Sequence, residues 1–342
     1  MERIKHRCSR VSRIGITTTV PSEVIWAAGM IPVDLNNLFI TSGHRDRYIK
    51  AAEHEGYPRN VCGWIKGIYG TLAVDDCIDT VIGVTQGDCS NTHALMETLQ
   101  LRNVRTIPFA YPYDRDPETL CREIGRLASE LGTTIPDAEE VCAALEPLRR
   151  KLDRLDEMTW KENRIRGQEN HFWLVSSSDF NGDWQEYEAK LDCFLAEASG
   201  RIPFCEPVRL AFIGVPPILD DFYDVAEEYG ARFVFNEVQR QFSMPDRKGG
   251  LVHQYRAYTY PYDIFHRLSF ILPELELRGV HGVIHYVQSF CHRQIEDLIL
   301  RKKIPLPVLT IEGDQPGRVD ERTRIRLQAF VELLGDRIKK QG

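Results

Sequence analysis

The chain has 342 residues, of which 43% are hydrophobic and 27% charged, and its net charge at pH 7 is −7. This length predicts two domains rather than one small core. The negative charge argues against a nucleic-acid-binding surface, and no apolar run approaches the ~20 residues that a membrane-spanning helix needs.

The nine cysteines indicate a reducing compartment, because they form no small secreted framework and no Cys-x-x-Cys pair. The first ten residues are charged and lack the apolar core of a signal peptide. We therefore expect a cytoplasmic protein whose cysteines are free, catalytic or bound to metal.

The first 115 residues predict an α/β domain. Strands are expected at 12–20, 31–35, 79–86 and 104–110, and a helix at 21–29 has Pro21 near its start and Gly29 at its end. The segment 41–59 is polar and is expected to be irregular. A further helix is expected to begin near Cys62.

Residues 116–200 predict a helical connecting segment. Leucine and isoleucine recur at helical spacing from Asp116 to Asn163, with a turn at 133–136. The stretch 168–183 has no clear period and is expected to form a loop over the site. A helix is expected at 184–198.

The last part, residues 201–342, alternates between strands and helices. Strands are expected at 208–214, 231–235, 281–290 and 307–311, and helices at 220–229, 263–278 and 322–335. This alternation predicts two doubly wound parallel sheets, of the Rossmann or flavodoxin-like kind, joined by the helical segment.

One stretch near each end carries the strongest functional signal. The β-branched run from Val81 to Thr85 stops at Gly87, where Asp88 is a candidate helix cap, so Cys89 lies between a buried strand and a helix. Cys291 follows the strand 281–290 in the same way. Ligands bind at the carboxyl ends of such strands, and a helix N-terminus favours a thiolate.

Cys62 also precedes a predicted helix, which makes it the third cysteine in such a position. Three thiolates suit a soft metal centre that keeps one position open. Cys121, Cys142 and Cys193 lie inside helical patterns and are expected to be ordinary core or surface residues. No glycine-rich phosphate-binding loop of the dinucleotide or P-loop spacing is present.

Several short motifs, in the same order along most of the chain, resemble the cluster-binding, D-component-like subunits of the 2-hydroxyacyl-CoA dehydratase and benzoyl-CoA reductase family. The motifs are Pro21-Ser-Glu-Val-Ile-Trp-Ala-Ala-Gly-Met-Ile-Pro-Val33, Cys62-Gly-Trp-Ile-Lys-Gly67, Gly87-Asp-Cys-Ser90, Gly214-Val-Pro-Pro217, Gly282-Val-Ile284 with Phe290-Cys291, Ile304-Pro305 with Leu309-Thr-Ile-Glu-Gly-Asp314, and Arg322-Thr-Arg324 with Ala329-Phe330.

The resemblance implies a [4Fe–4S] cluster held by Cys62, Cys89 and Cys291, with the fourth iron open. It implies one-electron reduction of an acyl-CoA thioester followed by elimination of water, which is lyase activity of a radical kind. The implied partners are an ATP-dependent iron–sulfur activator as electron donor, and a second cluster subunit in a homodimer or in a heterodimer with a paralogue.

Three residues beside the cysteines are catalytic candidates. Ser90 and His292 stand where the family often has an acidic residue, and His93 lies one helical turn beyond Cys89. His292 is a candidate donor to a cluster sulfur or to a substrate oxygen, and either Ser90 or His292 is a candidate fourth ligand. His285 is expected to be structural.

Weaker candidates are also present. Lys66 is expected either to bind a phosphate of coenzyme A or simply to be exposed. Trp64 is expected to pack in the core. Glu237 and Arg240 are a candidate pair behind the site, and 176–178 a candidate substrate loop.

Two alternatives to the dehydratase interpretation stay open from the sequence. The first is a [4Fe–4S]-type reductase of small or aromatic substrates, and the second is a non-catalytic metal-binding or assembly protein of the same fold. The chain is shorter than typical family members, and 236–245 replaces the family's usual aspartate-containing segment. Substrate identity therefore does not carry over.

Overall fold

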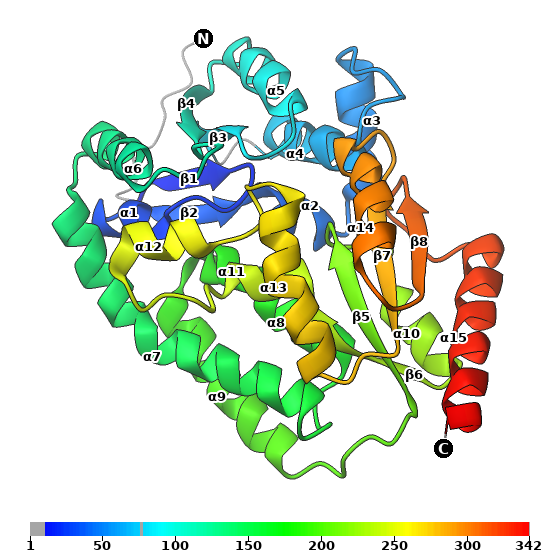
Figure 1. Cartoon of the computed structure of the whole chain (residues 1–342). Helices are drawn as coiled ribbons and strands as arrows, with labels where there is room; N and C mark the ends of the chain where they lie inside the picture. The colour runs from blue at the N-terminus through cyan, green and yellow to red at the C-terminus, as the bar shows by residue number, and fades with distance from the viewer. Residues whose placement is uncertain (1–10, 76–77, 342) are drawn as a thin grey trace.

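Two four-stranded sheets, each made only of parallel strands, form the centre of the molecule in the computed structural model, which describes residues 11–75 and 78–341 (Figure 1). A layer of helices from the middle of the chain lies alongside both sheets. The architecture confirms the predicted α/β class with two parallel-sheet domains. The boundaries 1–115, 116–200 and 201–342 remain the division that we propose.

The first sheet has the strand order β2-β1-β3-β4. Its strands are β1 (Arg13–Ile16), β2 (Ile31–Asp34), β3 (Thr80–Gln86) and β4 (Arg105–Ala110). Ile16 pairs with Asp34 on one side and with Ile82 on the other. The accompanying helices are α1 (Ser22–Ala27), α2 (Leu35–Ile40), α3 (Arg45–His54), α4 (Gly63–Val74) and α5 (Asn91–Gln100).

The second sheet repeats this order as β6-β5-β7-β8. Its strands are β5 (Val208–Gly214), β6 (Ala231–Asn236), β7 (Gly282–Gln288) and β8 (Val308–Gly313). The helices in this part of the chain are α10 (Phe222–Glu228), α11 (Glu237–Phe242), α12 (Gly250–Ala257), α13 (Ile264–Leu277), the 3₁₀ helix η3 (His292–Glu296), α14 (Asp297–Lys303) and α15 (Glu321–Gln341).

Both faces of each sheet are buried, which explains why the strands are almost continuously apolar. In the first sheet Ile14 and Ile82 face the α1 and α6 side, whereas Val33 and Val81 face α4 and α5. In the second sheet one face packs on α10 and α15, and the other on α13 and α14. Successive strand residues alternate between the two cores.

The middle of the chain forms a third, purely helical layer around Leu148, Leu152 and Leu174. Helix α6 (Pro117–Leu131) packs against the first sheet, and the layer consists of α7 (Ile135–Trp160), α8 (Gly167–Val175), the 3₁₀ helices η1 (Ser176–Ser178) and η2 (Phe180–Gly182), and α9 (Trp184–Ser199). The predicted turn at 133–136 is confirmed: Gly132 is left-handed, and Thr134 caps α7.

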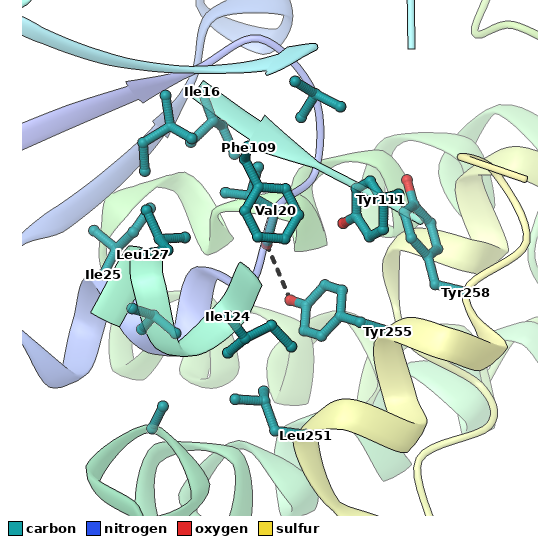
Figure 2. Close-up of a cluster of buried hydrophobic side chains, with 14 of the residues drawn as sticks. Ile16, Val20, Ile25, Phe109, Tyr111, Ile124, Leu127, Leu251, Tyr255 and Tyr258 are labelled. Carbon is teal, nitrogen blue, oxygen red and sulfur yellow. Dashed lines mark hydrogen bonds between the residues drawn. The ribbon is translucent and has the colours of Figure 1, made fainter. Parts of the chain in front are cut away.

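Part of the C-terminal half packs against the first sheet. Figure 2 shows Leu251, Tyr255 and Tyr258 of this part beside Phe109 and Tyr111 of the first sheet and its following loop. The Tyr255 hydroxyl donates a hydrogen bond of 3.0 Å to the backbone oxygen of Val20. The chain thus crosses back between β6 and β7, so the two halves share a core.

Two predictions about local structure are wrong. Segment 41–59 contains a helix, α3, rather than irregular chain, because Tyr48, Ile49 and Ala52 bury one narrow face of an otherwise charged segment. Segment 168–183 is helical rather than a loop. Two of the three buried positions of α8 are Gly167 and Asn170, and Phe172 is exposed, so the segment lacks the apolar period of an amphipathic helix.

The helix after Cys89 also begins later than predicted. Its first residue is Asn91, and Ser90 rather than Asp88 occupies the N-cap position, without a side-chain hydrogen bond. Leu95 and Leu99 of the predicted apolar face are buried, whereas Leu101 is exposed. Within the described residues, none of the helices is both long and apolar enough to cross a membrane.

A buried ion pair joins α1 to the helical layer. Glu23 is fully buried and accepts hydrogen bonds from Arg149 of α7 and from Gln254 and Tyr255 of α12. Burial alone would raise the pKa of Glu23, but Arg149 and the other donors lower it, so the carboxylate is charged at neutral pH.

We expect Glu23→Gln to lower the free energy of unfolding by about 3–5 kcal/mol, because the change leaves the Arg149 guanidinium buried without a counter-charge. The matched control is Glu186→Gln, which removes the exposed pair of Glu186 with Lys190 and should cost less than about 1 kcal/mol. Urea unfolding followed by circular dichroism measures both. Equal effects would contradict the structural role of the buried pair.

Candidate metal centre

A cavity of about 130 Å³ lies between the carboxyl ends of the two sheets. The residues that follow β1 and β3 line it from one side, and those that follow β5 and β7 from the other. These pairs of strands flank the point in each sheet where the strand order reverses, which is where open α/β sheets bind ligands. Thr17, Cys89, Pro216 and Cys291 each represent one of the four strand ends.

All three predicted cysteines line this cavity, although they come from three separate segments. Cys62 is the N-cap residue of α4, and Cys291 the N-cap residue of η3. Cys89 lies between β3 and α5, two residues before the helix begins. Cys89 and Cys291 follow the equivalent third strand of each sheet, so the two sheets place them alike.

The environment of the thiols is dry and rich in backbone donors. Burial raises the pKa of Cys62 to about 12, while the N–H groups of Trp64 and Ile65 act in the opposite direction. Burial likewise raises the pKa of Cys89 to about 11, opposed by the N–H of Asn91. The pKa values of Cys62 and Cys89 are each raised further by Cys291, so the three sulfurs lie close enough to interact electrostatically.

Asp88 and Arg293, which carry opposite charges when ionised, form another part of the wall. Burial raises the pKa of Asp88 to about 6, and the charge of Arg293 opposes this shift. The Arg293 guanidinium lies 4.4 Å from the ring centroid of Tyr260 and donates to the backbone oxygen of that residue and to Glu296. Asp88, Tyr260 and Arg293 all line the cavity.

The carboxyl groups of Asp34 and Asp179 lie near each other, buried at the end of β2. The Oδ2 atom of Asp179 accepts from the backbone N–H of Asp34 at 2.7 Å, and Asp34 accepts from Asn36 and from the Ser178 hydroxyl. Burial and the neighbouring Asp34 raise the pKa of Asp179 to about 7. Burial also raises the pKa of Asp34, which lines the cavity.

Three polar atoms of the lining have no hydrogen-bond partner among the described residues. They are Thr92 Oγ1, Trp64 Nε1 and Gln288 Oε1. The amide of Gln288 is oriented by its own Nε2, which donates to the Asp314 backbone oxygen at 2.6 Å. Its free oxygen is therefore an acceptor. Unpaired buried polar atoms cost free energy, which a bound ligand recovers.

The three predicted catalytic residues lie in different places. His292 lines the cavity, and burial lowers its pKa. Ser90 is exposed at the N-cap of α5, and His93 is exposed with its Nε2 3.0 Å from the backbone oxygen of Thr85. Neither Ser90 nor His93 is part of the described lining.

Lys66 is neither exposed nor at the cavity, which corrects the prediction for it. It is completely buried and donates to Glu53 of α3 at 2.9 Å. This ion pair holds α3 against α4. Trp64 is half-buried against Phe39 and also lines the cavity.

Glu237 and Arg240 do not pair with each other. Glu237 pairs with Arg267, and Arg240 with Asp156 and Glu274. His285 is buried in β7 with its Nδ1 2.8 Å from Asp297, as expected of a structural histidine. Residues 176–178 are buried, and Ser178 supports Asp34 rather than forming an open substrate loop.

Sequence reasoning missed the polar wall of the cavity. Thr17, Thr18 and Asp34 lie at the carboxyl ends of β1 and β2, so the rule applied to Cys89 also pointed to them. His171 and Val175 gave no such signal, because α8 was not predicted. Burial lowers the pKa of His171 to about 4, so its imidazole is neutral at physiological pH.

The donor set fits an iron–sulfur cluster. In the part of the chain that the structure describes, no group of three or more His, Cys, Asp and Glu side chains is close enough to hold a single metal ion. A cluster places a different iron beside each cysteine, so its ligands stand farther apart than those of one ion. Three soft sulfur donors line one cavity, and each faces backbone N–H groups, which is the kind of donor set that such a cluster uses.

The fold and the cavity define a two-domain α/β protein with a cysteine-lined site between its sheets. The family described as 2-hydroxyglutaryl-CoA dehydratase, D-component, matches residues 17–334, nearly the whole chain. The chain belongs to this family, which supports an enzyme-related role and a place among the components of a multi-subunit enzyme. A search of curated proteins finds no match.

The carboxyl pair yields a pH prediction. Between about pH 4 and about pH 7, Asp179 is protonated in the folded protein but ionised in the unfolded chain. Because unfolding then releases a proton, the free energy of unfolding falls as the pH rises through this range. Asp34→Asn removes the neighbouring charge and lowers the pKa of Asp179. We therefore expect the stability of Asp34→Asn relative to the unchanged protein to increase between pH 5 and pH 8.

Urea midpoints measured at several pH values provide the test. Ser178 can turn its hydroxyl toward the backbone oxygen of Val175, 3.1 Å away, so the new amide finds a partner without a steric change. The matched control is Asp183→Asn at the exposed N-cap of α9. A stability difference for Asp34→Asn that stays constant with pH would show that the charge of Asp34 does not raise the pKa of Asp179.

Proposed function

We propose that the protein is the iron–sulfur subunit of a 2-hydroxyacyl-CoA dehydratase-like enzyme, with a [4Fe–4S] cluster held by Cys62, Cys89 and Cys291. The observation that carries this proposal is the meeting of these three cysteines at one cavity from segments far apart in the chain. Membership of the dehydratase D-component family supports it independently.

The bound cluster supplies a low-potential electron and an iron that no cysteine ligates. The chain's own residues supply the surroundings. Ile65, Ile68, Val175 and Phe242 make much of the wall apolar, which excludes water from the reacting groups. The backbone N–H groups that face the three sulfurs stabilise their thiolate form.

The polar side of the cavity suits a thioester with a hydroxyl group beside it. Gln288 Oε1 is a free acceptor for a substrate hydroxyl, and Trp64 Nε1 a free donor for a carbonyl oxygen. Burial raises the pKa of both Asp34 and Asp179, that of Asp179 to about 7, and we propose that this pair of carboxyl groups exchanges a proton with the substrate through Asp34, which lines the cavity.

The partners follow from this chemistry. A low-potential electron requires a donor, for which we propose an ATP-dependent iron–sulfur activator protein. We propose a second cluster subunit in a homodimer or in a heterodimer with a paralogue, since the family is a component of a multi-subunit enzyme. The cytoplasm is the compartment that we propose.

The first test is the cluster itself. Anaerobically purified protein should contain about four iron and four sulfide per chain. Serine at Cys62, Cys89 or Cys291 should remove most of the iron, because each of them ligates a separate iron atom. Iron and acid-labile sulfide assays, together with the visible absorption spectrum, measure the loss.

Two cysteines outside the cavity serve as controls. Cys121 of α6 and Cys142 of α7 are half-buried and do not belong to the cavity lining, so their serine variants should keep a full cluster. Stoichiometric zinc without sulfide, or equal iron loss in all five variants, would count against the proposal.

The second test separates catalysis from simple cluster binding. If one iron is open, the electron paramagnetic resonance spectrum of the reduced protein should change when a 2-hydroxyacyl-CoA is added. His292 is the predicted fourth-ligand candidate that lines the cavity, and exposed Ser90 is its comparison. The proposal of an open iron is wrong if the unchanged protein shows no spectral change and only His292→Ala gains one. In that case His292 is the fourth ligand of the cluster in the unchanged protein.

The same experiment distinguishes the alternatives. A spectral response together with dehydration favours the lyase, and a response with net reduction of the substrate favours a reductase. Intact clusters that respond to no acyl-CoA favour a non-catalytic metal-binding or assembly protein. The family match favours the first of these because the matched component belongs to a dehydratase.

A further inference from the structure

A second cavity, of about 250 Å³, lies directly behind the first. Two short segments separate them. In one segment Gln241 lines the second cavity and the next residue, Phe242, lines the first. In the other segment Thr259 lines the second cavity and Tyr260 lines the first. The described linings of the two cavities have no residue in common, so the second cavity is separate from the first.

Two buried side chains in this cavity have unused polar atoms. Gln241 is 1% exposed, and its Oε1 accepts from the backbone N–H of Thr259 at 3.0 Å. This contact fixes the orientation of the amide, so its Nε2, which has no partner among the described residues, is a free donor. The hydroxyl of Thr259, which is 2% exposed, is also without a partner in the described structure.

Two arginines add positive charge to these donors. Arg115 and Arg256 line the cavity, and neither forms an ion pair within the described residues. The Nε atom of Arg115 is buried without a described partner, while the Nε atom of Arg256 donates to the Arg115 backbone oxygen at 3.2 Å. The guanidinium of Arg115 lies 5.6 Å from the ring centroid of Tyr262.

The other ionisable side chains near this charge are two histidines and two carboxylates, of which Asp263 caps α13 and acts on His266 from outside the lining. His266 has a buried Nε2 with no described partner, and burial and Arg115 lower its pKa, so the empty site holds it neutral. Asp246 is the acidic residue of the lining, and it lies at the exposed rim, 3.2 Å from His253. The buried part of the lining therefore presents unpaired donors and the Arg115 guanidinium, and the exposed Arg256 adds a second positive charge at the rim.

We propose that this second cavity binds a phosphate group. Two unpaired guanidinium groups match the double negative charge of a phosphate monoester, and the amide and hydroxyl supply further donors for its oxygens. A carboxylate carries one charge and leaves one arginine uncompensated. A metal cation is repelled by the same arginines. The inference does not depend on the function proposed for the cysteine-lined cavity.

The phosphate has two chemical sources, inorganic phosphate or a phosphate monoester on a nucleotide. Calorimetric titration of the full-length protein with inorganic phosphate, and separately with adenosine 3′,5′-bisphosphate, tests both at constant ionic strength in a phosphate-free buffer. We expect saturable binding with one site per chain. Binding of both probes identifies a site for the free anion, and binding of the bisphosphate alone identifies a nucleotide site.

Variants locate the site. Arg115→Gln and Arg256→Gln should each weaken binding about tenfold or more, because each removes a charge-assisted hydrogen bond. Gln241→Glu keeps the acceptor for Thr259 but replaces the free donor by a negative oxygen, so it should abolish binding. The matched control is Arg122→Gln, an exposed arginine on α6 that donates to Thr119 and lies outside the cavity.

Three outcomes overturn the proposal. Neither probe binds to folded protein at millimolar concentration; or all the arginine variants, the control included, weaken binding alike; or Cys291→Ser, which alters the first cavity alone, abolishes binding. Thermal unfolding of each variant without ligand shows whether it is folded. If Gln241→Glu fails to fold, the two arginine variants and their control decide the question.

Discussion

The site depends on one constraint: every strand in both sheets runs in the same direction as its neighbours. All the strands of a parallel sheet end at the same edge, where helix N-termini also begin. Here the carboxyl edges of the two sheets face one cavity. Backbone donors therefore converge on the cavity from both halves before any side chain is considered. The three cysteines occupy positions at which such donors already point.

The carboxyl edges of the two sheets can line one cavity only if the sheets keep a fixed position relative to each other. The core that the two halves share holds them in that position. The stretch between β6 and β7 returns to the first sheet, where Tyr255 binds the backbone of Val20 and joins Gln254 and Arg149 around Glu23 (Figure 2). The same stretch separates the two cavities through Phe242 and Tyr260. One segment thus shapes both sites and also connects the halves.

Much of the fold was predictable from sequence, because buried parallel strands read as short apolar runs and the intervening helices have clear periods. The positions of Cys62, Cys89 and Cys291 at the starts of helices were predictable for the same reason. Helices α3 and α8 were not predictable, since α3 buries a narrow stripe within a charged segment and α8 places Gly167 and Asn170 at buried positions while Phe172 is exposed. The pairing of Asp34 with Asp179 joins residues 145 positions apart, which no local pattern reveals.

The identical strand order of the two sheets has a consequence for how the protein is made. Cys89 and Cys291 occupy equivalent places in the two halves, but the ribosome synthesises the second of them about two hundred residues after the first. N-terminal domains generally fold first during synthesis, but the core of the first sheet here includes Leu251 and Tyr255, so its packing is completed only after these residues have been made. A cofactor held by all three cysteines can gain its last ligand only after Cys291, which follows β7, has been synthesised. Insertion of the proposed cluster would therefore be a late step of biogenesis.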